Sequence, residues 1–98
     1  MSDFKLLAPD RQLDIVIGFL APLYEVKKAE VLGKGRSGSV RACRRASMLF
    51  LRRAGWSKRA IGDAFGRHYT TVTSNCEKAV CTPVDRDRVE GAMRTFGL

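Results

Sequence analysis

Residues 61–72 read IGDAFGRHYTTV, and no other stretch constrains the fold of this chain as strongly. Ile61 and Phe65 stand one helical turn apart, as on the apolar face of an amphipathic helix, and Gly66 supplies a break at its C-terminus. Thr70 is suited to cap a second helix. We expect Val72, Cys76, Ala79 and Val80 on the core face of that helix, and Thr71, Ser74, Asn75 and Lys78 on its outer face.

The four side chains on the outer face of the second helix are all polar. Each of them can hydrogen-bond a base edge or a phosphate. A helix-turn-helix whose second helix carries such a face has the geometry that reads DNA. An ordinary helical hairpin shows similar spacing, so the pattern favours DNA binding and leaves a hairpin with another role as the alternative.

The positive charge of the chain is concentrated in one block. Residues 1–32 carry four basic and five acidic side chains, and residues 62–98 carry five of each. Residues 33–61 carry nine lysines or arginines and no acid, so they supply the surplus behind the net charge of +8. Such a block attracts phosphate and makes association fast and salt-dependent. The alternative is a solvated basic face on an otherwise ordinary domain.

The chain as a whole predicts an all-α fold of about six helices. Its 98 residues allow one domain, residues 9–98, after a flexible N-terminal arm, residues 1–8. Within the arm, the apolar side chains Phe4, Leu6 and Leu7 offer a way to fold back onto the body.

The first helix is expected to open at Pro9 and to end or kink at Pro22. Ile15 and Phe19 lie off its core stripe, which favours a wide buried face over the alternative of a partner surface. The core stripe itself holds Leu13, Val16, Ile17 and Leu20.

Five further helices are expected, at residues 28–32, 40 to about 54, 58–65, about 71–80, and from Pro83 onward. Their N-caps would be Ser39 for the third helix, Ser57 for the fourth and Thr82 for the last. The third helix is predicted to pack one face and expose a cationic one. Its packing side holds Val40, Cys43, Ala46, Ser47, Phe50, Leu51 and Ala54, and its opposite side holds Arg41, Arg44, Arg45 and Arg52, with Met48 among them.

Composition argues against several kinds of site. Three cysteines with no CxxC spacing and a single histidine do not make a zinc site, and free cysteines fit a reducing cytoplasm. We expect no enzyme activity, because no carboxylates or nucleophiles cluster. No signal peptide is recognisable, and the apolar runs are too short to span a membrane.

The loop at residues 33–40, GKGRSGSV, resembles the glycine-rich loop that covers ATP phosphates in protein kinases. The catalytic-loop aspartate and the DFG motif of a kinase are absent, so we expect no nucleotide cofactor. The glycines are instead interpreted as leaving a basic segment of backbone flexible enough to follow a DNA groove.

The sequence IGDAFG, followed by a basic residue, an aromatic ring and TTV, resembles the C-terminal DNA-binding domain of DnaA, the bacterial chromosomal replication initiator. Residues 23–32 resemble the second, short helix of that domain, residues 33–40 its basic loop, and residues 41–53 its long basic helix. The resemblance covers most of the chain and implies a Trp-repressor-like helix-turn-helix fold. The partner that it implies is double-stranded DNA.

The resemblance also implies a contact in each groove. The second helix of the pair would enter the major groove, and Arg36 would insert into the adjacent minor groove, where a narrow A/T-rich segment attracts a guanidinium. Lys58 and Arg59 lie where backbone amides of the family meet phosphate. The candidate DNA-binding residues are Lys34, Arg36, Arg41, Arg44, Arg45, Lys58, Arg59, Arg67, His68, Tyr69, Thr70, Thr71, Ser74, Asn75 and Lys78.

The turn departs from the family pattern. The family usually has Gly-Arg-Asp-His before the threonine pair, whereas this chain has Arg67-His68-Tyr69, one residue shorter. His68 replaces an aspartate that would accept from a cytosine amino group, and Ser74 replaces a histidine that reaches the DNA. We therefore expect the scaffold to be retained and the initiator's own box not to be bound tightly.

The leading interpretation is a bacterial or phage transcription regulator, of the kind found in gene transfer agents, acting on the nucleoid in the cytoplasm. The chain begins with its own methionine and lacks the initiator's ATPase domain, so we expect it to bind DNA without melting an origin. One alternative is a replication-control protein at origin sites. Another is an adaptor that contacts RNA polymerase through Ile15 and Phe19. The chain as the N-terminal domain of a longer protein remains an open alternative.

Overall fold

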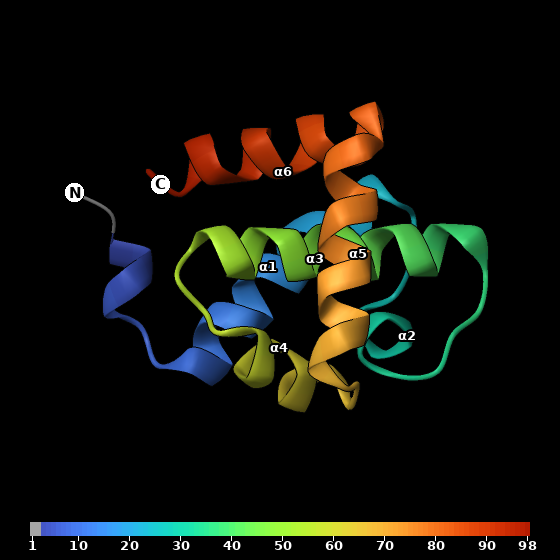
Figure 1. Cartoon of the computed structure of the whole chain (residues 1–98). Coiled ribbons are helices and arrows are strands. Elements are labelled where there is room, and N and C mark those ends of the chain that lie inside the picture. Colours follow the sequence, from blue (N-terminus) through green and yellow to red (C-terminus); the bar gives the residue numbers. More distant parts are fainter. Residues whose placement is uncertain (1–2) are drawn as a thin grey trace.

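The computed structural model describes residues 3–98 and is all-helical over that range (Figure 1). A short 3-10 helix, η1, precedes six α-helices, which confirms the expected fold class and number of helices. No helix in the described range has the length and hydropathy needed to cross a bilayer. The elements are η1 (Asp3–Leu6), α1 (Pro9–Leu23), α2 (Lys28–Leu32), α3 (Gly38–Arg53), α4 (Lys58–Phe65), α5 (Tyr69–Cys81) and α6 (Pro83–Thr95).

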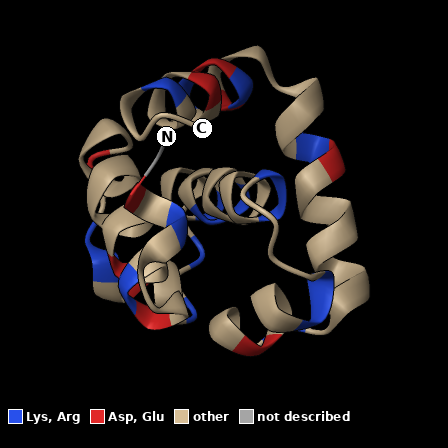
Figure 2. Cartoon of the chain, turned by 90° about the vertical axis from the view of Figure 1, so that its left-hand side faces the viewer, with Lys and Arg blue, Asp and Glu red and all other residues tan. Residues whose placement is uncertain are grey.

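Helix α3 runs through the middle of the fold, and the other helices surround it. Figure 2 looks along α3, and Figure 1 shows α5 crossing it while α4 and α6 lie on opposite sides. The expected packing side of α3 is buried throughout. The expected cationic side is wrong at three positions, because Met48 is fully buried, Arg44 is only 6 % exposed, and the Arg45 side chain is 15 % exposed. A central helix contacts neighbours on every side and therefore has no continuous solvent face.

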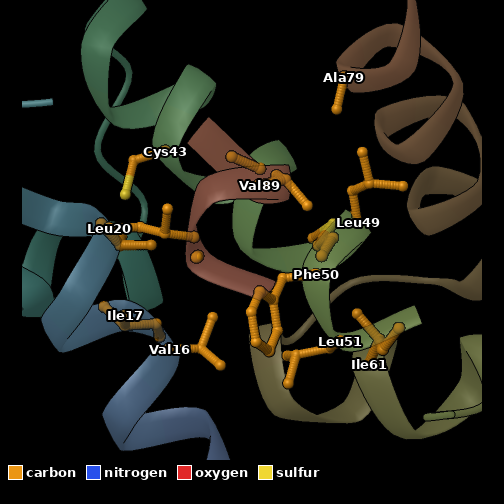
Figure 3. Packing of buried hydrophobic residues seen from close by; sticks show 14 of the residues in the cluster. Val16, Ile17, Leu20, Cys43, Leu49, Phe50, Leu51, Ile61, Ala79 and Val89 are labelled. Atoms are coloured by element: carbon orange, nitrogen blue, oxygen red, sulfur yellow. The ribbon is translucent and has the colours of Figure 1, made fainter. Parts of the chain in front are cut away.

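The core gathers apolar side chains from every α-helix around α3 (Figure 3). Phe50 lies at its centre, between Val16 of α1 and Ile61 of α4. Burying a side chain of this size contributes about 1.5–3 kcal/mol. On α5, Val72 and Ala79 are buried as expected, whereas Val80 is 40 % exposed, because α5 runs beyond the edge of α3 at its C-terminal end.

The N-terminal segment packs onto this core over the described residues. Phe4 is buried, and its ring centroid lies 5.4 Å from that of Phe50 and 5.7 Å from that of Phe96. Of the three apolar residues considered for folding back, Phe4 does so, while Leu6 stays largely exposed. Residues 1–2 of the expected arm lie outside the described range.

Four helices end in the same hydrogen-bonded motif. The backbone N–H of Arg67 donates to the Gly62 carbonyl and that of Gly66 to the Asp63 carbonyl, over 2.8 and 3.3 Å. This pair of bonds is a Schellman motif, which places one residue in the left-handed conformation. That residue is Gly55 after α3, Gly66 after α4, Gly97 after α6, and Glu25 after α1.

The N-caps agree with the sequence at one helix and differ at three. Ser57 caps α4 as expected, accepting from the Ala60 N–H over 3.1 Å. Helix α3 is capped by Ser37 rather than Ser39, because the helix begins earlier, at Gly38. Helix α5 is capped by His68 rather than Thr70, for the same reason. The Thr82 hydroxyl makes no cap bond and donates instead to the Lys78 carbonyl over 2.8 Å.

Candidate nucleic-acid interface

The turn between α4 and α5 is closed tightly. A Cβ at Gly62 would lie 2.5 Å from the Arg67 carbonyl oxygen, well inside van der Waals contact. Gly66 has φ +64°, where a side chain is strained. Two glycines therefore allow α5 to leave α4 at a sharp angle, and they fix the direction of α5 relative to α4.

The expected outer face of α5 is the face that the structure leaves open. Thr71, Ser74 and Lys78 are exposed, and Asn75 is half-buried. The Ser74 hydroxyl donates to the Thr70 carbonyl over 3.3 Å, and the Asn75 amide to the Thr71 carbonyl over 2.9 Å. These bonds orient the two side chains and leave the carbonyl oxygen of Asn75 and the lone pairs of Ser74 as acceptors for a DNA donor.

Arg44 ties down the loop between α2 and α3. Its Nε donates to the Val31 carbonyl over 3.0 Å, and one terminal nitrogen lies 3.0 to 3.2 Å from the carbonyls of Glu30, Gly33 and Gly35. The glycines of the loop permit close packing, since a Cβ at Gly35 would lie 2.9 Å from Val40 Cγ1. The interpretation of this loop as a flexible backbone segment is therefore wrong at Gly33 and Gly35.

Arg67 joins the same loop to the helix-turn-helix. Its guanidinium donates to the Gly33 carbonyl over 3.2 Å and also to the Phe65 carbonyl. The Gly33 carbonyl thus accepts from an arginine of α3 and from an arginine of the turn. We counted Arg67 among the candidate DNA-binding residues, and in this structure its side chain is half-buried and bonded to backbone.

Basic side chains surround a hollow of about 420 Å³ between this loop and the turn. Among residues 3–98, no acid lines the hollow and no ion pair neutralises its cations. Burial, followed by the nearby charges of Arg67 and Arg41, lowers the pKa of Arg44 from its usual value. Like charges held together without a counter-charge favour an anion there. The hollow is lined by Lys34, Gly35, Arg36, Arg41, Arg44, Gly66 and Arg67.

Arg45 is placed differently from the expectation. Its Nε donates to Asp85 Oδ2 over 2.7 Å, and its side chain is 15 % exposed. The other Asp85 oxygen accepts from the Tyr24 hydroxyl over 2.6 Å. Burial, together with this bond to Asp85, raises the pKa of the Tyr24 hydroxyl. Arg45 therefore belongs to a buried cluster that joins α1, α3 and α6, and the charge that we assigned to DNA is neutralised by Asp85.

Lys58 and Arg59 are exposed in the first turn of α4, where the sequence placed them. A smaller hollow of about 160 Å³ lies beside them, lined by Arg59, Asp63, Arg67, His68 and Tyr69. His68 and Tyr69 are both exposed at the start of α5. Polar and basic side chains from the first turn of α4 and the first turn of α5 thus lie close together on the surface.

Sequence reasoning missed the part that backbone carbonyls play. The residues that set the interface geometry include Gly33, which acts through its carbonyl, and Gly62, which acts through its lack of a side chain. The signal for Gly62 was a glycine inside a predicted helix, which lowers helix stability and therefore indicates a close contact. The contact at Gly33 left no such signal, because every residue has a backbone carbonyl and only the folded structure brings Arg44 and Arg67 to this one.

Two other expectations concern residues outside this interface. Among the described residues, no group of histidines, cysteines or acids stands close enough together to hold a metal ion. Ile15 and Phe19 are half-buried and pack against the core, with the Phe19 ring 5.4 Å from that of Phe96. The wide buried face that we favoured for the first helix is therefore confirmed.

Comparison with known proteins agrees with the geometry. The family model described as the bacterial dnaA protein helix-turn-helix matches residues 13–79. That range runs from α1 to the last turn of α5, and it contains both the basic loop and the helix-turn-helix. A search of curated proteins finds no match. On its sequence match, and with the all-helical fold expected of it, the chain belongs to the family of the DnaA C-terminal helix-turn-helix domain.

Proposed function

We propose that this protein is a sequence-specific, double-stranded DNA-binding regulator of transcription. The observation that carries the proposal is the joint presentation of α5 and the basic loop, held together through the Gly33 carbonyl. Helix α5 supplies a polar face to the major groove, and Arg36 extends from the loop toward the adjacent minor groove. Family membership supports the DNA-binding part of this proposal.

The charge distribution supports contact with the phosphate backbone. Exposed cations border the helix-turn-helix, and none of them forms an ion pair within the described residues. Each phosphate that a cation neutralises releases counterions, which lowers the logarithm of the binding constant by about 0.9 per logarithmic unit of salt. The exposed cations in question are Lys34, Arg36, Arg41, Lys58, Arg59 and Lys78.

The test is selection of bound sequences from random duplex DNA, followed by affinity measurement at several salt concentrations. We expect an enriched motif that differs from the initiator's box, because His68 and Tyr69 stand where the family pattern has its base-reading side chains. An affinity that falls steeply with salt and does not depend on sequence would show a nonspecific DNA-binding protein. Tight, selective binding to the initiator's box would contradict the expected change of specificity.

Genome-wide occupancy then distinguishes regulation from replication control. Peaks at promoters, with changed transcript levels after deletion, support the regulator. A single peak at the replication origin supports the replication-control alternative. The adaptor alternative is tested by changing Ile15 and Phe19 to polar residues, although their packing against the core makes a loss of stability the expected result.

A further inference from the structure

His68 occupies a special position at the start of α5. Its Nδ1 accepts the backbone N–H of Thr70 over 3.3 Å, which caps the helix. The same Nδ1 lies 2.9 Å from the Thr70 hydroxyl oxygen. One ring nitrogen therefore faces two donors of Thr70.

These two contacts determine where the imidazole proton lies. A nitrogen that accepts from a backbone N–H carries no proton of its own, so the Thr70 hydroxyl must be the donor in the second contact. The neutral ring then carries its proton on Nε2. No hydrogen bond within residues 3–98 uses Nε2, which leaves an N–H donor available on an exposed side chain.

The ring is also held in place on its face. The centroids of the His68 and Tyr69 rings lie 4.3 Å apart, with 34° between the planes. The cap bond, the hydroxyl contact and the ring contact together restrict the rotation of the imidazole. A donor that is oriented before binding loses little conformational freedom when it meets its acceptor.

We propose that His68 determines base specificity, and that its Nε2–H reads a hydrogen-bond acceptor in the major groove. This inference rests on the proposed function and specifies the site that α5 recognises. Guanine presents two acceptors there, N7 and O6, whereas cytosine presents only a donor, its amino group. The contacted position therefore favours guanine and disfavours cytosine.

The charged neighbours of His68 agree with this assignment. Arg59, Asp63 and Arg67 line the same hollow as His68 and Tyr69. Arg67 is bonded to the carbonyls of Phe65 and Gly33, so both terminal nitrogens of its guanidinium already donate to backbone. At this end of α5, the Nε2–H of His68 is consequently a donor that is both oriented by the helix cap and free to read a base.

Two substitutions separate the cap from the donor. H68N keeps a cap acceptor in its side-chain oxygen and keeps a donor in its amide, whereas H68D keeps the cap and replaces the donor with an acceptor. Selection from random duplexes is carried out with the wild type and both variants. The readout is the ranking of bases at each position, because the added negative charge of H68D lowers the affinity for every duplex.

We expect one position at which the wild type and H68N enrich guanine over cytosine and H68D reverses the ranking. In duplexes that differ only there, the wild type should discriminate by about threefold to tenfold, as expected of one hydrogen bond. Thermal unfolding should show that both variants fold. The inference is overturned if H68D binds selectively and ranks the bases at every position as the wild type does.

The same selection experiment distinguishes a failure of the proposed function from a failure of the assignment of His68. If the wild type enriches no sequence at all, the regulator proposal fails, and the assignment of His68 fails with it. If the wild type enriches a motif that neither variant alters, only the assignment of His68 fails. In that case His68 acts as a helix cap alone.

Discussion

Arg44 and Arg67 donate to the same carbonyl oxygen, that of Gly33, over 3.0 and 3.2 Å. Arg44 belongs to the central helix, and Arg67 belongs to the turn of the helix-turn-helix. The loop that presents Arg36 is therefore fixed relative to the helix that presents the reading face. The separation of the two proposed groove contacts is set by hydrogen bonds within the protein and exists before DNA arrives.

Replacing Arg44 with alanine should destabilise the protein. Its guanidinium makes four hydrogen bonds to carbonyls of α2 and of the loop that follows, from a largely buried position, and their loss should lower the free energy of unfolding by about 3 kcal/mol. Urea denaturation measures this change. The matched control is R41A, which removes an exposed arginine of the same helix and should cost less than about 0.5 kcal/mol. Equal effects of the two substitutions would contradict a structural role for Arg44.

Replacing Arg36 with alanine should weaken specific DNA binding and leave stability unchanged. Arg36 is exposed at the rim of the basic hollow, and inserting it into a minor groove is worth about 1–3 kcal/mol. Fluorescence anisotropy with the selected duplex gives the affinity. R94A is the control, since it removes the same charge from α6, on the far side of the fold from α4 (Figure 1). If R36A and R94A weaken binding equally, the effect of Arg36 is net charge alone.

The contrast between these arginines shows where sequence reasoning succeeds. Helical periodicity and glycine breaks predicted the first and last residues of α4 correctly, because both are local properties of the chain. The same periodicity assigned Arg41, Arg44 and Arg45 to one cationic side. Only the packed structure distinguishes an arginine that meets solvent from one that meets carbonyls of α2 and the loop after it, or a carboxylate of α6. Those partners lie 9 to 40 residues away in sequence.

Replacing Asp85 with asparagine should cost about 3 kcal/mol of stability, because it leaves the largely buried Arg45 charge without its counter-ion. The carboxylate also accepts from the Tyr24 hydroxyl, so an amide cannot satisfy both donors in the present geometry. Thermal or urea unfolding tests this. D87N, an exposed position on the same helix, is the control and should change stability by less than about 0.5 kcal/mol.

Glycine at position 25 should stabilise the protein. Glu25 has φ +56° at the end of α1, in the position that glycine takes after α3, α4 and α6. Relief of this strain, less the greater freedom that glycine gives the unfolded chain, should add about 0.5–1 kcal/mol. E25A is the control, since alanine removes the charge but keeps the strain. A gain in E25A as large as that in E25G would assign the effect to charge.

The three cysteines should differ in reactivity. Burial raises the pKa of the Cys43 thiol from 9.0 to about 11, whereas Cys81 is exposed. A disulfide reagent at pH 8 should modify Cys81 rapidly and Cys43 only at the rate of unfolding. Single cysteine-to-serine variants identify the reacting thiols, and equal rates for Cys43 and Cys81 would contradict the buried position.

The raised pKa of Cys43 also predicts a loss of stability in alkali. Between pH 9 and about 11 the thiol ionises in the unfolded chain while the folded protein keeps it protonated. The contribution of this thiol is therefore complete below pH 9 and is lost as the pH rises to about 11. Urea denaturation at several pH values measures the slope. C43A should show a shallower decline over this interval than the wild type.

The candidate site was predictable in outline and not in detail. The basic block and the polar face of α5 follow from the sequence, because charge and helical period are visible there. The cap of α5 was assigned to Thr70, two residues beyond His68, because serine and threonine are the commoner caps. Which atom of His68 faces outward depends on that cap bond, so its donor became visible only with the structure.

Helix α6 lies beyond the matched range, which ends at residue 79, yet it supplies Asp85, Val89 and Ala92 to the interior. The segment that the family model matches is therefore shorter than the segment that folds together in this protein. A fragment trimmed to the matched residues would leave Tyr24 and Arg45 without their shared acceptor and would uncover one side of α3. Grafting the DNA-reading surface onto another protein would consequently require the last helix, even though none of the proposed DNA contacts comes from it.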